Sequence, residues 1–158
     1  MMALGYLISN SEESLNLLCR INIELKRYIE DPLLALAKNR KSDLSTRDYA
    51  ICMSALRSHL CTLVSRIFDP RKGMISFVNI EWFKQPKIKE TLGKIRKEEI
   101  IQAILKTRHT FIAHVDPNVQ DIISVDQICD STLKELLEDL NRIYNLWLLT
   151  NNVRRGSL

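Results

Sequence analysis

The stretch that decides the fold class is TLKELLEDLNRIYNLW, residues 132–147. Its apolar residues recur at helical spacing, at Leu133, Leu136, Leu137, Leu140, Ile143, Tyr144 and Trp147. An α-helix turns once in about 3.6 residues, so these side chains form one broad apolar stripe. Thr132 and Glu135 have the spacing of a capping box and predict that the helix begins there. The tail that follows, residues 151–158, is polar and is expected to fray.

Two further helices are predicted upstream. The first begins near Asn10, which could cap it together with Glu13. Its apolar residues are Leu15, Leu18, Leu25 and Ile29. The second begins at the capping pair Ser45 and Asp48 and ends before the turn signal of residues 69–73. Its apolar face is expected to contain Tyr49, Cys52, Leu56, Leu60, Leu63 and Ile67.

A third helix is predicted to begin after Pro86 and to reach about Ile112 or Ala113. Its apolar row is Ile88, Leu92, Ile95, Ile100, Ala103, Ile104 and Phe111, with a phase shift around residues 98–99. Residues 74–83, although rich in β-branched and aromatic side chains, are expected to form a connecting segment. With only four glycines and four prolines in 158 residues, long helices are favoured. We expect an all-α fold, an antiparallel helical bundle of four to five helices, in a single domain spanning residues 1–158.

The four cysteines, Cys19, Cys52, Cys61 and Cys129, form no CxxC pair. A zinc site or thioredoxin-like motif is therefore not expected, and the sequence indicates no metal and no cofactor. Reduced cysteine packs as a small hydrophobe, and three of the four occupy apolar helical positions, so core packing is predicted. The N-terminal residues lack the basic region and apolar run of a signal peptide, and no stretch approaches the ~20 apolar residues that span a bilayer. A cytoplasmic location is expected.

Positive charge collects on the third predicted helix. The net charge of the chain is +4, and the segment from residue 84 to 108 alone exceeds this value. Its basic residues are Lys84, Lys87, Lys89, Lys94, Arg96, Lys97, Lys106 and Arg108, against Glu90, Glu98 and Glu99. One interpretation is a solvated helix face. The other is a path for an RNA or DNA backbone, in which Lys94, Lys97 and Lys106 bind phosphate.

An Arg-His cluster follows directly, in Arg108-His109-Thr-Phe-Ile-Ala-His114-Val-Asp116-Pro117. Cleavage of RNA by its own 2′-hydroxyl needs a base for that hydroxyl, an acid for the leaving oxygen and a positively charged group that stabilises the anionic phosphorane. His114 suits proton transfer, and Arg108 suits phosphate binding. His109 could orient the substrate or supply the second proton-transfer group. Asp116 could fix the tautomer of His114. The structural alternative is that Arg108 pairs with Asp116 or with an acidic residue of the fourth helix, while His114 caps the third helix. His59, on the second helix, is interpreted as an ordinary helix-face residue.

The arginine and histidine pattern resembles the signature of the HEPN superfamily of small helical bundles. The string from Lys106 to Asp116 is similar to the abortive-infection AbiU-type branch, and so is the earlier segment Ser65-Arg-Ile-Phe-Asp69 followed by Ile75-Ser76. The likeness covers about residues 51–116, together with the fourth helix by length and position. His109 departs from the Asn or Asp that usually follows the arginine.

The resemblance implies a homodimeric, metal-independent endoribonuclease of toxin or antiviral type. Arg108 and His114 would lie in a cleft between two protomers, and single-stranded RNA would be the substrate. A neutralising antitoxin or other regulatory protein would be a further partner. The superfamily also contains members without catalytic activity, so the alternative is a HEPN-like module that binds RNA or protein. A plain helical partner protein, such as an antitoxin or assembly factor, is a third interpretation.

Overall fold

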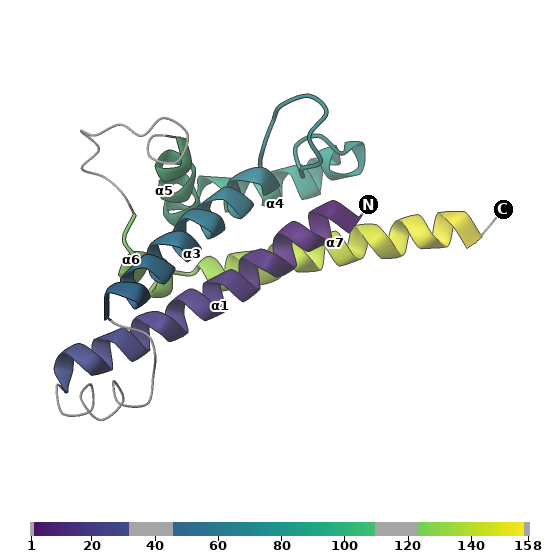
Figure 1. Cartoon of the computed structure of the whole chain (residues 1–158). Helices are drawn as coiled ribbons and strands as arrows, with labels where there is room; N and C mark the ends of the chain where they lie inside the picture. Colours follow the sequence, from purple (N-terminus) through teal and green to yellow (C-terminus); the bar gives the residue numbers. More distant parts are fainter. Residues whose placement is uncertain (1, 32–45, 110–122, 157–158) are drawn as a thin grey trace.

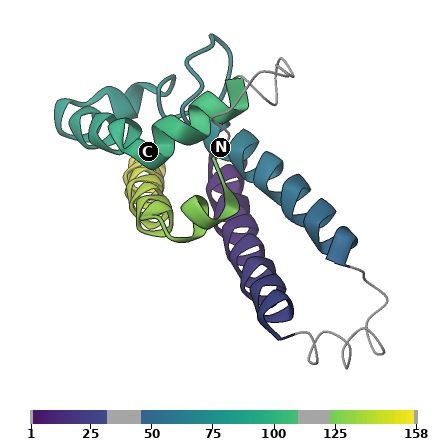
Figure 2. The same ribbon diagram turned by 90° about the vertical axis from the view of Figure 1, so that its left-hand side faces the viewer.

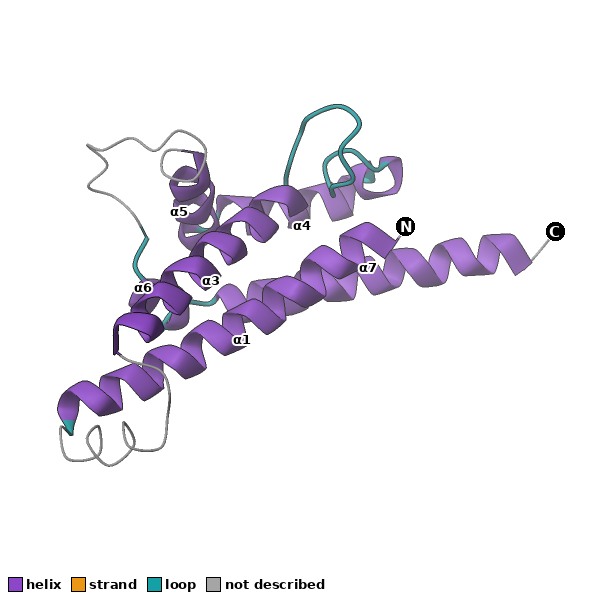
Figure 3. Cartoon of the chain, viewed as in Figure 1, coloured by secondary structure: helices purple, strands orange, loops and turns teal. Residues whose placement is uncertain are grey.

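The computed structural model describes residues 2–31, 46–109 and 123–156. Within these ranges six α-helices and one 3-10 helix are present and no strand is found (Figure 3). Their bounds are α1 Met2–Glu30, α3 Thr46–Ile67, η1 Glu81–Lys84, α4 Pro86–Lys97, α5 Glu99–Thr107, α6 Val125–Cys129 and α7 Leu133–Gly156. The predicted all-α fold is confirmed.

Three long helices form the body of the molecule. Helix α1 lies between α3 and α7 and runs antiparallel to both (Figures 1 and 2). Helices α4 and α5 lie across one side of this group, where α5 packs on α3 and α4 contacts α7. Residues from five of the helices are completely buried in the core, namely Leu4, Ile8, Leu18, Leu60, Val64, Ile67, Ile101, Ile104, Ile128, Leu133, Leu137 and Leu140. Burial of this apolar surface is the main stabilising contribution.

Helix α1 begins at Met2, eight residues before the start predicted at Asn10. The prediction of an Asn10 cap was wrong because Leu4, Leu7 and Ile8 extend the apolar stripe toward the N-terminus and are buried. Gly5 allows this end of α1 to approach α7, since a Cβ there would lie 2.7 Å from the Tyr144 ring. Tertiary packing thus extends the helix beyond its strongest local capping signal.

The predicted third helix is two helices. The chain is extended at Glu98, with φ −56° and ψ 138°, so α4 ends at Lys97 and α5 begins at Glu99. Leu92 of α4 and Ile101 of α5 are both buried, although nine residues of continuous helix make about 2.5 turns and would place them on opposite faces. Because the chain breaks at Glu98, apolar residues of both α4 and α5 are buried. Residues 110–122, including Ile112 and Ala113, lie outside the described residues.

The other boundaries follow the predictions more closely. Helix α3 ends at Ile67 as expected, although Cys52 on its predicted apolar face is exposed. Ile29, which was predicted to belong to the apolar face of the first helix, is 68% exposed. Residues 74–83 form a connecting segment, as predicted. The 3-10 helix η1 at the end of this segment was not predicted. Helix α7 begins at Leu133 and continues to Gly156, past the residue at which fraying was expected.

Short helix α6 was not predicted. Ser124 caps it, with Ser124 Oγ accepting from the Gln127 N–H at 3.1 Å and Gln127 Oε1 accepting from the Ser124 N–H at 2.8 Å. This helix brings Cys129 to α1, where it forms a disulfide with Cys19 across a Cα–Cα distance of 5.4 Å. The prediction of core packing was therefore wrong for this pair. It is confirmed for Cys61, which is buried, and burial raises the pKa of its thiol to about 11.

Candidate functional site

The Arg-His cluster begins where α5 ends. Thr107, the last residue of α5, is buried, and Arg108 and His109 continue in a wider, π-helical turn. The Arg108 side chain is half-buried and His109 is exposed. The chain returns to this point at Ile123, whose backbone N–H donates to Thr107 Oγ1 at 3.2 Å. The end of α5 is thus hydrogen-bonded to the segment that leads into α6.

Arg108 and His109 line a cavity of about 280 Å³ with residues that are distant in sequence. The end of α3, the turn that follows it, the last turns of α4 and the end of α5 all contribute to its walls. The lining residues are Ser65, Phe68, Asp69, Pro70, Arg71, Arg96, Leu105, Arg108 and His109. We call this cavity the arginine cleft. Three arginines and one carboxylate make it a site suited to an anion.

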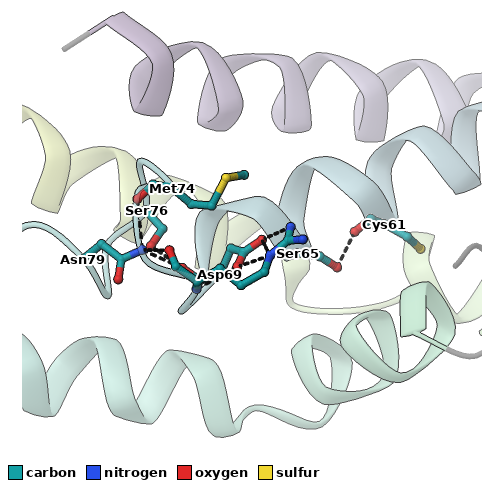
Figure 4. A network of polar contacts seen from close by, with 7 residues as sticks. Cys61, Ser65, Asp69, Met74, Ser76 and Asn79 are labelled. Atoms are coloured by element: carbon teal, nitrogen blue, oxygen red, sulfur yellow. Dashed lines mark hydrogen bonds and ion pairs between the residues drawn. The ribbon is translucent and has the colours of Figure 1, made fainter.

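Asp69 organises the turn at one wall of the arginine cleft (Figure 4). Its carboxylate is buried and accepts hydrogen bonds from the backbone N–H and the Nε of Arg71, each at 3.0 Å. Its backbone carbonyl accepts from Ser76 Oγ at 2.6 Å and from Asn79 Nδ2 at 3.1 Å. Asn79 Nδ2 also donates to the carbonyls of Arg71 and Met74. The turn is therefore held by side-chain hydrogen bonds.

The charge of Arg108 acts on this same carboxylate. Hydrogen bonds from the Arg71 side chain are the largest cause that lowers the pKa of Asp69 below its ordinary value, against the opposing effect of burial. The backbone hydrogen bond and charge of Arg71 add to the lowering, and so does the charge of Arg108. Asp69 is thus ionised at neutral pH and offsets part of the positive charge in the cleft.

The lysines predicted to bind RNA lie elsewhere. Lys94 is exposed on α4 and forms an ion pair with Glu90 at 2.9 Å, which lowers the pKa of Glu90. Lys97 is exposed at the end of α4. Lys106 lines a separate cavity of about 700 Å³ with the acidic residues Glu98, Glu99 and Asp130. That larger cavity suits a phosphate poorly because carboxylates repel it.

Arg96 and Arg71 reach the cleft but were not predicted as site residues. Arg96 was named only among the basic residues of the segment from residue 84 to 108. It lines the same cavity as Arg108 because the chain is extended at Glu98, whereas one continuous helix would keep these two residues apart. Arg71 lies between the two stretches, Ser65 to Asp69 and Ile75-Ser76, for which the HEPN resemblance was stated. His114 and Asp116 lie outside the described residues. His59 is an exposed residue of α3 and does not line the cleft.

Within the described part of the chain, no helix is both long and apolar enough to span a bilayer. Comparisons of the chain with protein-family models, with curated proteins and with solved structures gave no match. The resemblance to the HEPN superfamily therefore depends on the motif residues alone.

Proposed function

We propose that this protein binds single-stranded RNA in the arginine cleft and cleaves it without a metal ion. The observation that supports this best is that Arg96, Arg108 and His109 line one cavity. Arginine presents planar N–H donors that match two oxygens of a phosphate, and it keeps its charge at every physiological pH. Phosphate binding is thus the chemistry that the described residues favour.

Cleavage would proceed by attack of the 2′-hydroxyl on the adjacent phosphorus, which leaves a 2′,3′-cyclic phosphate and a free 5′-hydroxyl. His114 would act as one proton-transfer group and His109 as the other, while Arg108 would stabilise the charge of the phosphorane. Asp116 would hold the tautomer of His114. Lys94 and Lys97, which are exposed on α4, remain proposed contacts for RNA that extends beyond the cleft, whereas the acidic cavity around Lys106 disfavours a phosphate there.

The biological setting that we propose follows the HEPN resemblance. The protein would be a cytoplasmic homodimer, a toxin or antiviral abortive-infection factor held in check by an antitoxin or other regulatory protein. Leu146 and Leu149 of α7 are 54% and 64% exposed, and such apolar residues favour association with another protein surface. Light scattering at micromolar concentration tests the dimer directly.

The alternative is a HEPN-like module that binds RNA or protein without catalysis. It is favoured by one observation, that the described lining of the arginine cleft contains a single histidine, His109. Acid–base cleavage of RNA needs two proton-transfer groups. The alternative therefore keeps the binding role of the arginines and drops the cleavage of RNA.

The decisive experiment incubates purified protein with mixed single-stranded RNA in excess EDTA. Wild type should cleave with an optimum near neutral pH, and His114→Ala should abolish cleavage. His59→Ala is the matched control, since His59 is exposed and lies outside the cleft, and it should cleave like wild type. Equal results for wild type and His114→Ala would contradict the catalytic proposal.

Binding is tested separately by fluorescence anisotropy of a labelled RNA. Arg108→Gln should weaken binding and reduce the slope of log affinity against log salt by about 0.7, the value for one phosphate contact on a single strand. Arg142→Gln changes the net charge equally, on an exposed arginine of α7, and should have little effect. Similar losses in both variants would indicate diffuse charge attraction and not a site.

A further inference from the structure

Two arginines of the arginine cleft have no acidic partner among the described residues. Arg96 lies in the last turn of α4, and Arg108 follows directly after α5. Both line the cleft, and neither forms an ion pair with a carboxylate within residues 2–31, 46–109 and 123–156. On the same helix as Arg96, Lys94 is paired with Glu90 at 2.9 Å. The two guanidiniums therefore leave positive charge in the cleft that these parts of the chain do not neutralise.

The third arginine of the cleft is already neutralised. The Asp69 carboxylate is buried, and the Nε and Nη2 of Arg71 both donate to it. This pair carries no net charge. His109, the remaining titratable residue of the described lining, adds no negative charge. The unpaired charge of the described lining is thus that of Arg96 and Arg108.

The size and the walls of the cleft favour one phosphate group. Its volume is about 280 Å³, below the roughly 300–1,000 Å³ of pockets for drug-sized ligands. Phe68, Pro70 and Leu105 supply apolar parts of the lining. Apolar walls lower the local dielectric constant, which strengthens the attraction between a guanidinium and a bound anion. In a cavity of this size the two unpaired guanidiniums act on the same phosphate.

The two kinds of phosphate in an RNA strand differ in charge. A phosphate inside the strand is a diester with one negative charge. A phosphate at the end of the strand is a monoester, which carries about 1.5 to 2 negative charges at pH 7 and offers three acceptor oxygens. Each arginine binds such oxygens through two N–H groups at once. Two unpaired guanidiniums therefore match a terminal phosphate better than an internal one.

We infer that the arginine cleft binds the terminal phosphate of a single-stranded RNA through Arg96 and Arg108. The inference rests on the proposed binding of RNA and adds a preference for a phosphorylated end. It is compatible with cleavage, because addition of the deprotonated 2′-hydroxyl to an internal phosphate also gives a phosphorane with two negative charges. An internal phosphate would reach that charge only in the transition state.

The test compares internally labelled RNA strands that differ only at one end, by fluorescence anisotropy. All of them carry 2′-O-methyl groups, which prevent cleavage. One strand ends in a 5′-phosphate and a second in a 3′-phosphate. In the control for each strand, a methyl ester removes the second negative charge of the terminal phosphate.

Wild type should bind at least one of the phosphorylated strands about 5- to 30-fold more tightly than its methylated control. This range lies below that of a charge-assisted hydrogen bond in a buried site, because solvent screens an exposed arginine. The strand with the larger difference identifies the end that the cleft receives.

Two variants of neighbouring residues locate the preference. Arg96→Gln should bind each phosphorylated strand no more tightly than its methylated control. Lys97→Gln removes one charge from the next residue of α4, which is exposed and does not line the cleft. It should weaken the binding of all strands and keep the preference. A preference that persists in Arg96→Gln, or that disappears in Lys97→Gln, would contradict a site at Arg96.

Equal binding of phosphorylated and methylated strands by wild type would overturn the inference and leave the proposed RNA binding intact. Absence of binding to every strand would overturn both. Inorganic phosphate should displace the phosphorylated strand only in large excess. Displacement at equal concentration would show that the cleft takes free phosphate, and the inference would be wrong. Because the strands are compared on wild type, the end preference is tested even if Arg96→Gln does not fold.

Discussion

Replacement of Asp69 by asparagine removes one charge from the arginine cleft and leaves the side-chain size nearly unchanged. In the folded protein the carboxylate accepts from the backbone N–H and the Nε of Arg71, each at 3.0 Å, and also from its Nη2. The Asp69 side chain is 8% exposed, whereas the Arg71 side chain is 62% exposed. The variant therefore weakens these hydrogen bonds without leaving a buried cation behind.

The magnitude follows from the kind of hydrogen bond that is lost. A bond to a charged group contributes about 1.5–3 kcal/mol and a neutral one about 0.5–1.5 kcal/mol. Because solvent screens the exposed guanidinium, we expect Asp69→Asn to lower the free energy of unfolding by about 1 kcal/mol at pH 7. Asp69→Ala also removes the acceptor of the Arg71 backbone N–H and should cost about 2–3 kcal/mol.

The difference between wild type and Asp69→Asn should depend on pH. The pKa of Asp69 is lowered in the folded state from 3.8, so its contribution to stability is complete above about pH 4 to 5. It is lost as the pH falls through the folded-state pKa, where the carboxyl group becomes protonated. Urea unfolding at pH 7 and at pH 2.5 to 3 measures the change. A difference that stays the same at both pH values would refute the assignment of this stability to the Asp69 charge.

The same variant also bears on RNA binding. Asp69 is the one carboxylate among the described residues that line the arginine cleft, so its loss raises the positive charge there and frees Arg71. Asp69→Asn should bind single-stranded RNA more tightly than wild type at low salt, with a salt slope steeper by about 0.7. Weaker binding by a folded Asp69→Asn would show that the anion site lies elsewhere.

Two predictions concern the contacts of α1 with α6 and with α7. The Cys19–Cys129 disulfide links residues that are 110 positions apart in the sequence. Its reduction should lower the free energy of unfolding by about 3–5 kcal/mol. Identical urea midpoints with and without dithiothreitol would contradict this. Gly5→Ala should destabilise the protein by about 1–3 kcal/mol, because the new Cβ would lie 2.7 Å from the Tyr144 ring. A thermal midpoint equal to that of wild type would show that the Tyr144 ring can shift to accept the added Cβ.

Helical periodicity in the sequence was sufficient to predict the fold class and the helices built on long apolar stripes. The start of α7 at Leu133 and the end of α3 at Ile67 agree with the predicted boundaries. Each of these helices has one dominant apolar face, and rotation of the helix about its axis would expose that face to water. The helix and its buried side can therefore be predicted from its own sequence. The chemistry of Arg108 and His109 was also apparent from their residue types and their place after a basic segment.

Predictions from local sequence patterns missed the short helix α6 and placed the start of α1 wrongly. The signal for α6 was present in Ser124 and Gln127, which have capping-box spacing, but five helical residues are too short to show periodicity. The extension of α1 to Met2 depends on Leu4 and Ile8 finding partners in the core. Both features are decided by burial against other helices, which outweighs local preference.

Only the tertiary structure decided which residues share the site. The break at Glu98 turns α5 relative to α4, and as a result Arg96 and Arg108 line one cavity while Lys106 lines another. The turn after α3 brings in Asp69 and Arg71, and α6 brings Cys129 to Cys19. A sequence specifies which faces are apolar, whereas the distance between residues on different helices depends on how those faces pack together. The residue types of the site could therefore be predicted from the sequence, whereas their arrangement around one cavity could not.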